Sequence, residues 1–479
     1  MKQIEDNQLF SKSVIWELQT EAYQNFGPEA WAQKGVPFYL TSNPLIAQQF
    51  ARVVERYFLE IPEVDPSEPI YLFDLGAGSG RLAYLMLKHL MPLYDRFPFV
   101  YVMTDMVEEN LHFWRDHTRL EPFFEKGVLD CALYKNDRTE PLELQVSGEV
   151  LDSTVNPVVL ICTYFFDTIP QDLFRVNGNR LEEGRISVSV PEGSTSELDP
   201  DWISTLKESY AFHPIDDVSK YYPLRCANKI LSEYAQEMEG ATFLFPSGSL
   251  LSLEYFRKLS NSRMLLLAGD QGMSSKDQIM RWGTPHISRH SSFSIAVNYH
   301  ALARYFELND GLGFLPSVPD HRFAIIAGIL GEGVYNQTCL SFYQEMRSLQ
   351  PVEYWHLTGL TDEQVEKMSL KQLLILVKLG NYDPLNMNCY FKQVREKLKD
   401  ADEETIDLLK NVVKGCVGNF YPVNPSEGDF VMNMGVLLFE AKDYASAAQV
   451  FSFAGSIKGM DAQLMQNLAL CKEKMRAKI

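Results

Sequence analysis

A glycine-rich loop early in the chain is the clearest candidate ligand site in the sequence. A short apolar run ends in Asp74, and Gly76, Gly78 and Gly80 follow at alternate positions, with Ala77 between the first two. Glycine has no Cβ, so a sharp turn here lets the backbone approach a bound ligand closely. A carboxylate beside such a loop would repel a pyrophosphate and would attract a ligand with a cationic end. The loop therefore predicts a site for a small cationic ligand.

Two neighbouring features narrow the choice of ligand. A dinucleotide-binding loop of the form G-x-G-x-x-G needs its third glycine one position later, where this chain has Arg81, so a nicotinamide-dependent oxidoreductase is not favoured. The next apolar run, "FVYVMTD", ends in a second acid, Asp105. The alternative interpretation is that the loop is only a tight turn that binds no ligand. The two acids at corresponding strand ends disfavour this alternative.

The loop and its acids resemble motif I of class I S-adenosylmethionine-dependent methyltransferases. The resemblance implies S-adenosyl-L-methionine as the cofactor, with Asp105 on the ribose hydroxyls and Met106 on the adenine face. It also implies that Asn136 and Asp137, at the end of the third strand "VLDCALYKND", lie near the adenine amino group. The implied cofactor-binding residues are Asp74, Gly76, Ala77, Gly78, Gly80, Asp105, Met106, Asn136, Asp137 and Thr163.

The fourth apolar run, "VVLICTYFFDTIPQDLFRV", carries a more specific resemblance. It is similar to the Asn-Glu-Phe-Phe-Asp-Ala-Leu-Pro signature of the MidA family, the complex I assembly methyltransferases and their bacterial relatives, at Phe165, Phe166, Asp167 and Pro170. The segments "FYLTSNPLIAQQFA", "NRLEEGRISVSV", "LLLAGDQG" and "HSSFSIAVNYHALARYF" follow the family's order. The similarity covers about residues 20 to 335 and implies a methyltransferase acting on a protein or peptide.

Departures from the signature bear on the substrate. Tyr164 replaces the signature glutamate, Thr163 replaces the asparagine before it, and Asn43-Pro44 stands where the family's N-terminal loop has its glutamate. A guanidinium is best held by carboxylates, so methylation of arginine is not expected to carry over. An alternative to the enzyme is a scaffold that binds the cofactor but has lost methyl transfer.

The remaining candidate catalytic residues are Asp167, Tyr164 and Asp270, which could orient an acceptor or remove its proton. The alternative is that Tyr164 and the two phenylalanines only wall the pocket while Asp167 caps a helix. His286, His290 and His300 surround the last strands, and one could be a base, but ordinary polar roles are the favoured interpretation.

The elements that must position these residues follow from the alternation of short apolar runs with longer amphipathic ones. This order predicts an α/β fold with a doubly wound, Rossmann-like methyltransferase sheet. The predicted domains are an N-terminal helical cap and loop over residues 1 to 65, the methyltransferase domain over 66 to 335 with an insertion at about 171 to 262, and an α-helical domain over 340 to 479. Within the insertion, "RLEEGRISVSV" alternates like an exposed strand.

The helical domain shows features of a tetratricopeptide-like repeat. "NMGVLLFEAKDYASAAQVFSFAG" has small and large residues spaced as in such a helix pair, and "QNLALCKEKM" would start the next helix. Lys442-Asp443-Tyr444 repeats an upstream Gly380-Asn381-Tyr382, although the 62 positions between the tyrosines do not fit twice the usual period of about 34 residues. An unrelated helical bundle is the alternative. The domain could present a peptide to the site or only pack against it.

Composition sets the remaining limits. Among the 479 residues, Asp and Glu outnumber Lys and Arg by 63 to 44, which disfavours a chain that coats nucleic acid. Seven scattered cysteines suggest neither a metal site nor disulfides. No segment has the length and apolar character of a signal peptide or a membrane span, so a soluble cytoplasmic protein without a membrane partner is expected. The oligomeric state stays open.

Overall fold

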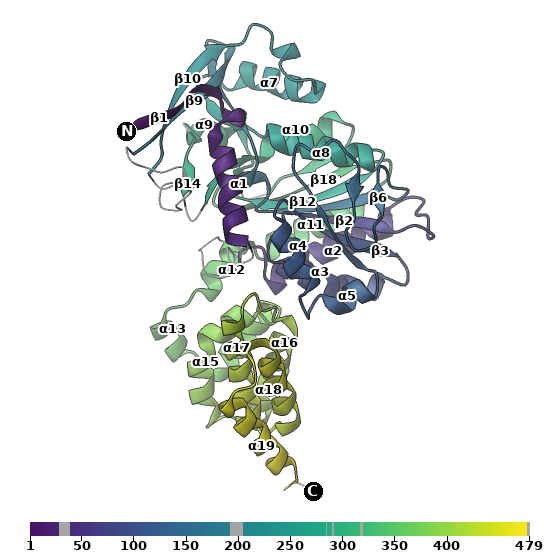
Figure 1. Cartoon of the computed structure of the whole chain (residues 1–479), viewed down its shortest axis with the longest axis vertical. Helices are drawn as coiled ribbons and strands as arrows, with labels where there is room; N and C mark the ends of the chain where they lie inside the picture. The colour runs from purple at the N-terminus through teal and green to yellow at the C-terminus, as the bar shows by residue number, and fades with distance from the viewer. Residues whose placement is uncertain (28–38, 192–204, 284, 290–291, 317–319, 477–479) are drawn as a thin grey trace. The chain divides into compact units, whose positions relative to one another are not determined.

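The computed structural model describes residues 1–27, 39–191, 205–283, 285–289, 292–316 and 320–476. They form two compact units. The first consists of Met1–Thr41 and Phe50–Ser348, and the second of Ser42–Gln49 and Leu349–Ile479. Figure 1 labels their helices and strands.

A seven-stranded sheet forms the centre of the first unit. Its strand order is β17-β18-β12-β7-β2-β3-β4, in which β12, β7, β2, β3 and β4 are parallel and β18 runs antiparallel to β12. The prediction of a mixed α/β fold with parallel strands is thus confirmed. The strands are β2 (Ile70–Leu75), β3 (Phe99–Asp105), β4 (Leu129–Leu133), β7 (Val158–Thr163), β12 (Met264–Asp270), β17 (Leu312–Phe314) and β18 (Ala324–Leu330).

Helices cover both faces of this sheet because its central strands are apolar on both sides. Tyr71 and Phe73 of β2 pack with α8 (Ser247–Leu259) and α10 (Tyr299–Leu308) in one core. On the opposite face, Phe58 of α2 (Pro44–Glu60) lies against Phe99 of β3, their ring centroids 6.4 Å apart. In Figure 1, α8 and α10 lie on one side of the sheet and α2 and α3 (Arg81–Leu90) on the other.

The chain order reverses between β2 and β7, which are neighbours in the sheet although β3 and β4 come between them in sequence. In open α/β sheets, ligands generally bind outside the carboxyl ends of the strands at such a reversal of strand order. Asp74, Asp105, Thr163 and Asp270 all lie at the carboxyl ends of strands of this sheet. The fold therefore collects residues from four distant parts of the sequence at one edge.

The long segment between β7 and β12 builds most of a second, five-stranded sheet of order β1-β9-β8-β11, with β10 also paired to β9. Its core on one side consists of apolar residues shared with α1 (Val14–Phe26), and α7 (Arg225–Glu237) packs on the other side. The strands are β1 (Lys2–Leu9), β8 (Asp172–Asn177), β9 (Arg180–Val190), β10 (Lys207–Pro214) and β11 (Thr242–Phe245).

Two features of the second sheet differ from the sequence prediction. β9 is a strand as expected, but it alternates between buried and half-buried residues because it has partners on both sides, so it is not an exposed strand. β1 was not predicted, because its residues are almost all polar and exposed and give no apolar alternation.

Shorter elements complete the first unit. The helices are α4 (Glu108–Arg115), α5 (Glu121–Glu125), α9 (Lys276–Trp282) and α11 (Asn336–Ser348), with 3₁₀ turns at Phe10–Lys12, Met91–Leu93, Phe166–Thr168 and Val218–Lys220. The short strands are β5 (Leu142–Glu143), β6 (Val150–Leu151), β13 (Gly272–Met273), β14 (Ile287–Arg289), β15 (Phe293–Ile295) and β16 (Val297–Asn298).

The second unit is helical over its described residues from 349 to 476. Its helices are α12 (Pro351–Thr358), α13 (Asp362–Lys367), α14 (Leu370–Leu379), α15 (Pro384–Leu398), α16 (Glu403–Asn419), α17 (Gly428–Glu440), α18 (Tyr444–Lys458) and α19 (Ala462–Arg476), with a 3₁₀ turn at Pro425–Glu427. Helix α19 begins upstream of the predicted "QNLALCKEKM" start, because Asp461 accepts a hydrogen bond from the Leu464 amide at the helix N-terminus.

The repeated turn in the tail is a helix-capping turn. Tyr382 and Lys442 have φ angles of 61° and 60°, and each precedes an aspartate that caps the next helix. Asp383 caps α15 through the Leu385 amide, and Asp443 caps α18 through the Ser446 amide. The structure therefore matches Tyr382 with Lys442 and Asp383 with Asp443, which is two positions away from the pairing of the two tyrosines suggested by sequence. Assignment to a tetratricopeptide-like repeat stays a prediction.

Contact between α17 and α18 depends on a glycine. A Cβ on Gly435 would lie 2.5 Å from Cε1 of Phe451, whereas a Cβ on Gly455 would meet only the flexible end of the exposed Met460, at 2.6 Å. Overpacking of a core costs about 1–3 kcal/mol, and alanine gains roughly 1 kcal/mol over glycine in a helix. We expect Gly435→Ala to lower the free energy of unfolding in urea and Gly455→Ala to leave it equal or higher. Equal effects of the two substitutions would contradict this packing.

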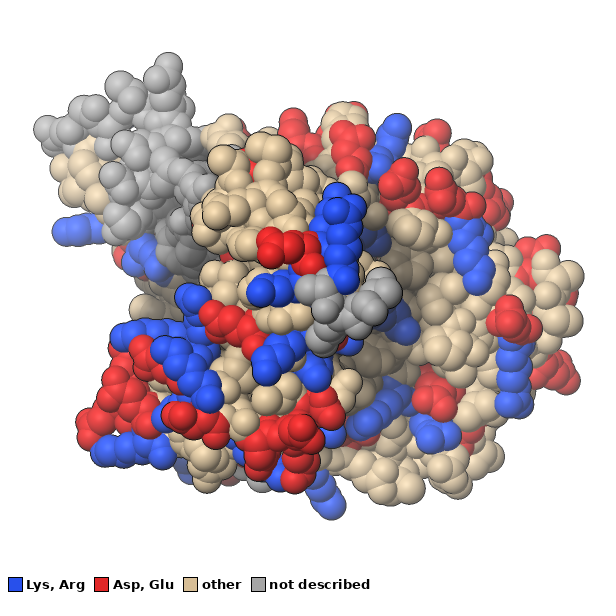
Figure 2. Space-filling model, turned by 90° about the horizontal axis from the view of Figure 1, so that it is seen from below, with Lys and Arg blue, Asp and Glu red and all other residues tan. Residues whose placement is uncertain are grey.

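Two surface properties accompany the fold. Acidic and basic side chains are intermixed on the face that Figure 2 shows. Among the described helices, none has both the length and the apolar character needed to cross a membrane.

Candidate functional site

The glycine loop connects β2 to α3 at the carboxyl edge of the sheet. Gly76, Gly78 and Gly80 have φ angles of 70°, 56° and 78°, in the left-handed region that favours glycine. The Ala77 amide donates to the Thr104 carbonyl at 2.9 Å, which ties the loop to β3. A Cβ on Gly76 would lie 3.1 Å from Cδ2 of Phe165. The loop is therefore held in one shape by its own backbone and by the segment after β7.

The two acids predicted from the sequence lie on either side of this loop. Asp74 is buried, and its Oδ2 accepts a hydrogen bond from the Tyr101 hydroxyl at 2.9 Å. Asp105 accepts one from the Gly78 amide at 3.2 Å and one from the Val107 amide at 3.1 Å. Burial raises the pKa of Asp74 to about 7 and that of Asp105 to about 6. The carboxyls of Asp74 and Asp105 thus lie beside the glycine loop. Among the described residues, none of their hydrogen-bond partners is a Lys, Arg or His side chain.

An open cavity of about 680 Å³ lies beside the segments that follow β3 and β4. Met106, the residue after Asp105, lines it together with Asp137 and Tyr134. Gln24 and Asn25, from the end of α1, form a further part of its wall. No sequence pattern indicates a role for the α1 residues, because they precede the sheet by more than a helix length of chain. Tyr134 could have been found from its place directly after the third strand.

Asn136 does not line this cavity. The third strand ends at Leu133, earlier than expected, so the predicted pair falls in a turn. The Asn136 amide nitrogen lies 3.1 Å from the position of a Cβ on Gly248, and Asn136 lines a separate cavity of about 400 Å³ beside α8. Its predicted contact with the same ligand as Met106 therefore finds no support in the cavity, whereas Asp137 lies on both cavities.

The segment after β7 brings the three predicted catalytic residues together. Asp167 lies in the 3₁₀ turn that follows Tyr164, and Asp270 ends the neighbouring strand β12. The amide of Phe166, the residue before Asp167, donates to Oδ2 of Asp270 at 3.1 Å, and the charge of Asp167 acts on the Asp270 carboxyl. The turn is capped by Phe165, without a side-chain hydrogen bond, so Asp167 is not the helix cap of the alternative interpretation.

These two carboxyls are buried and strongly perturbed. Burial raises the pKa of Asp167 to about 6. Burial, followed by the charge of Asp167, raises the pKa of Asp270 well above its usual range. Within the described part of the chain, the Oδ1 atoms of both aspartates have no hydrogen-bond partner. Buried polar atoms are normally paired, so these two indicate a place where a ligand could bind.

Two tyrosines complete the cluster and were not predicted. Tyr23, near the end of α1, has its pKa raised first by burial and then by the charges of Asp167, Asp105 and Asp270, which places it between both acidic groups. Tyr299 begins α10 and is fully buried, and burial followed by Asp270 and Asp167 raises its pKa. Both are far from the strand ends in sequence, so no local pattern indicates their place in the site.

The histidines lie outside this cluster as far as the structure describes them. His300 contacts the Tyr234 hydroxyl through Nδ1 at 2.7 Å, and burial lowers its pKa to about 4. His286 is exposed, and His290 lies outside the described residues. Among the described residues, no group of three or more His, Cys, Asp or Glu side chains could hold a metal ion.

Tyr164 carries backbone strain, with a φ of 52°. A non-glycine residue in this region costs about 1–2 kcal/mol, which glycine avoids. We therefore expect Tyr164→Gly to be more stable than Tyr164→Ala by about 1 kcal/mol in chemical denaturation. The same pair of substitutions at Thr163, in the strand, should give the opposite order. Alanine as the more stable residue at position 164 would show that the turn relaxes without the tyrosine.

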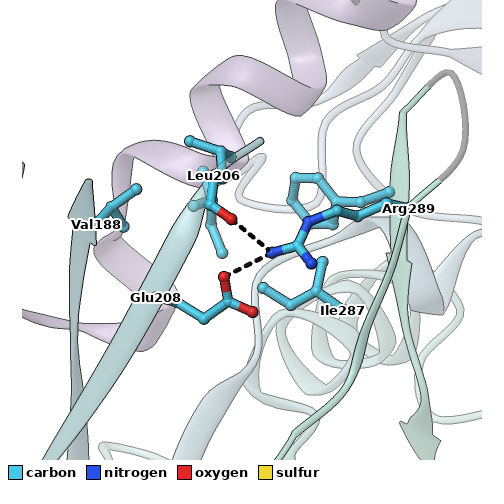
Figure 3. Close-up of a pocket in the computed structure, with 7 residues that line it drawn as sticks. Val188, Leu206, Glu208, Ile287 and Arg289 are labelled. Atoms are coloured by element: carbon cyan, nitrogen blue, oxygen red, sulfur yellow. Dashed lines mark hydrogen bonds and ion pairs between the residues drawn. The ribbon is translucent and has the colours of Figure 1, made fainter. Parts of the chain in front are cut away.

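A third, much smaller cavity lies apart from the carboxyl edge of the seven-stranded sheet. It has a volume of about 10 Å³, room for roughly one water, and lies among apolar side chains of the second sheet and α1. In Figure 3, Arg289 closes it by donating from Nη2 to the Leu206 carbonyl at 3.2 Å and to Glu208 at 2.6 Å. This cavity is too small for a cofactor, so the carboxyl edge of the sheet is the better candidate site.

No protein-family model and no curated protein matches the chain. Among solved structures, it is similar to a candidate methyl transferase from Burkholderia thailandensis bound to S-adenosyl-homocysteine, with 14% identity, coverage of 70% of this chain and 90% of the other, and a TM-score of 0.44. An uncharacterized protein from Burkholderia thailandensis, in a native crystal structure, shares 13% identity, with 66% of this chain and 93% of the other covered and a TM-score of 0.38. The CurJ carbon methyltransferase shares 12% identity, with 65% of this chain and 58% of the other covered and a TM-score of 0.28. At this level of similarity, the function has to be argued from the site itself.

Proposed function

We propose that this protein is an S-adenosyl-L-methionine-dependent methyltransferase of the MidA type. The observation that carries the proposal is the meeting of Asp74, the left-handed glycine loop and Asp105 at the ends of two adjacent parallel strands. Asp74 would hold the ammonium of the methionine end, and the glycines allow the backbone to approach it. The two oxygens of Asp105 each accept one backbone hydrogen bond and keep lone pairs for the ribose hydroxyls.

The cavity beyond Asp105 suits an adenine ring. Met106 offers a polarisable side chain to the ring face, and Tyr134 adds an aromatic wall. Asp137, at the rim, can accept a hydrogen bond from the exocyclic amino group. When bound, the cofactor supplies an electrophilic methyl group on a sulfonium. Residues are thus proposed for the ammonium, the ribose and the adenine of the cofactor.

The aspartate pair and its tyrosines are proposed to receive the acceptor. Asp167 lies in the turn after β7, the strand directly beside β2 and its glycine loop, and Asp270 ends β12, the next strand beyond β7. Their buried, raised-pKa carboxyls can orient a nucleophile and take its proton. Tyr164 packs against Phe323, with ring centroids 5.4 Å apart, and walls this side of the site. We propose that the acceptor belongs to a protein or peptide and that the helical unit holds this partner.

Cofactor affinity should depend on pH through Asp74 and Asp105. Both pKa values lie above the usual 3.8, so the unliganded protein loses stability from these groups as the pH rises to about 7. Binding requires the charged carboxylates, so the affinity changes in the opposite direction. We expect the affinity for S-adenosylmethionine to fall about tenfold per pH unit below the pKa of Asp74. Calorimetric titrations between mildly acid and mildly alkaline pH measure this slope, and a flat profile would contradict it.

Two experiments test the proposed function. Calorimetry compares the binding of S-adenosylmethionine and of NAD to the protein. If S-adenosylmethionine does not bind, the proposal is wrong. Incubation with radiolabelled cofactor and a lysate of the source organism then tests transfer. Label in a protein, absent with Asp74→Ala, would support the enzyme. Cofactor binding without label transfer would favour the scaffold alternative.

A further inference from the structure

We propose that Asp167 and Asp270 share a single proton and that the group methylated beside them is a nitrogen that is uncharged before transfer, such as an amine in its free-base form. This inference rests on the proposed methyltransferase function and specifies its substrate class. Such an uncharged acceptor differs from a guanidinium group, which enters the site as a cation.

The contact between the two carboxyl groups carries the first part of the proposal. Asp167 lies in the turn after β7 and Asp270 ends the neighbouring strand β12, and they are 2% and 0% exposed. The amide of Phe166, the residue before Asp167, donates to Oδ2 of Asp270 at 3.1 Å, which brings the two carboxyl groups close together. A carboxylate has only acceptor oxygens, so neither carboxyl group can donate to the other unless one of them carries a proton. Two negative charges at such a distance in a buried place would also repel strongly. The pair therefore holds one proton and one negative charge.

The surroundings of the pair bring no compensating cation from the described residues. The described side chains that interact electrostatically or by hydrogen bonds with the pair are Tyr23 of α1, Cys162 of β7, Tyr164, Ser294 of β15 and Tyr299 of α10. All are neutral or acidic. The single negative charge is thus available to the ligands, and the sulfonium of the proposed cofactor brings one positive charge to balance it.

Charge and hydrogen-bonding capacity then decide the class of acceptor. A guanidinium would add a second positive charge and offers only donors, and its fork fits two ionised carboxylates. In a carboxyl pair that shares one proton, the proton is held within the pair and the remaining oxygens are acceptors. An uncharged amine can donate its N–H groups to these oxygens while its lone pair stays free to attack the methyl group. The methylated nitrogen becomes cationic, and the negative charge of the pair stabilises that product.

Three buried oxygens mark the position of this acceptor. Oδ1 of Asp167, Oδ1 of Asp270 and the hydroxyl of Tyr299 have no hydrogen-bond partner in the described part of the chain. Leaving each of these buried oxygens without a hydrogen bond would cost about 1–3 kcal/mol of folding free energy. Because Tyr299 comes from a helix far from both strands in sequence, its hydroxyl is an independent indication that a polar group binds here.

The transfer step balances with these groups. The lone pair of the nitrogen forms the new N–C bond while the C–S bond breaks and its electron pair stays on sulfur. One proton of the cationic product nitrogen then moves to the ionised oxygen of the pair. Release of that proton to water returns the pair to its starting state.

Infrared spectroscopy tests the shared proton without relying on enzyme activity. At mildly alkaline pH, Asp74 and Asp105 are ionised, since their pKa values are about 7 and about 6. We expect the C=O stretch of one protonated carboxylic acid to persist there and to shift when aspartate carries carbon-13. The band should disappear in Asp167→Asn and in Asp270→Asn.

A matched control and the second measurement complete the test. Asp172→Asn removes another buried aspartate, which accepts from the Tyr222 hydroxyl at 2.5 Å outside the site, and should leave the band unchanged. No band in the folded wild-type protein would overturn the shared proton. In the lysate experiment, label released by acid hydrolysis as an N-methylated amine would support the acceptor class. Label as methylated arginine, or no transfer from bound cofactor, would overturn it. Failure to bind cofactor would instead reject the proposed function and leave the infrared result standing.

Discussion

Asp105→Ala should lower the affinity for S-adenosyl-L-methionine by about 100-fold or more in calorimetry. A hydrogen bond to a charged group contributes about 1.5–3 kcal/mol, and Asp105 is proposed to accept two from the ribose. The substitution also removes the acceptor that holds the Gly78 amide at 3.2 Å, so the glycine loop loses part of its preorganisation. Both effects act on binding and neither depends on the identity of the acceptor.

Asp172→Asn is the matched control for this effect. It changes a carboxylate of comparable burial, bonded to Tyr222 in the second sheet, and should cost stability without changing cofactor affinity by more than a few fold. Thermal denaturation of both variants separates loss of folded protein from loss of binding. A folded Asp105→Ala protein with unchanged affinity would remove Asp105 from the proposed cofactor site.

Asp167→Asn and Asp270→Asn should each lower the methyl-transfer rate by about 10²–10⁴-fold while cofactor affinity changes little. Either amide breaks the carboxyl pair and removes the group proposed to take the proton. The two aspartates lie at β7 and β12, whereas the glycine loop follows β2, so the cofactor contacts stay in place. Label transfer and calorimetry on the same preparations measure the two quantities.

The control for this pair is Asp130→Asn. Asp130 is buried and accepts hydrogen bonds from the backbone amides of Val146 and Ser147, away from the carboxyl edge. It should lower stability and leave the transfer rate per folded molecule unchanged. Loss of cofactor binding in the Asp167 or Asp270 variants, or a double variant worse than either single one by the product of both effects, would contradict a pair that acts as one unit.

The sequence predicted those parts of the site that are local in the chain. Asp74, Asp105 and Thr163 end apolar runs, and parallel strands bring such ends to one edge, so their shared position followed from the pattern. The third strand was predicted to end at Asn136-Asp137, but β4 ends at Leu133, and Asn136 lies in the following turn and lines another cavity. Strand length is set by pairing with β3, which a single sequence does not show.

The parts that escaped prediction depend on distant contacts. Tyr23 reaches the site from α1, and its role follows from how α1 packs on the second sheet. The sequence of β1 has no apolar alternation that would predict a strand. Its extended conformation depends on pairing with β9, which is distant in sequence. In the tail, helices were predictable from their periodicity, but the equivalence of Asp383 with Asp443 became visible only from their caps.

The pairing of β1 with β9 has a consequence for synthesis of the protein. The Asn7 amide donates to the hydroxyl of Ser187, a residue 180 positions later in the chain. At a translation rate of about 5–20 residues per second, β1 leaves the ribosome roughly 10–40 s before its partner exists. During that time its polar sequence, with the charged residues Lys2, Glu5 and Asp6, keeps it from pairing with other chains. The lack of an apolar pattern in β1 thus suits a strand that must wait for its partner.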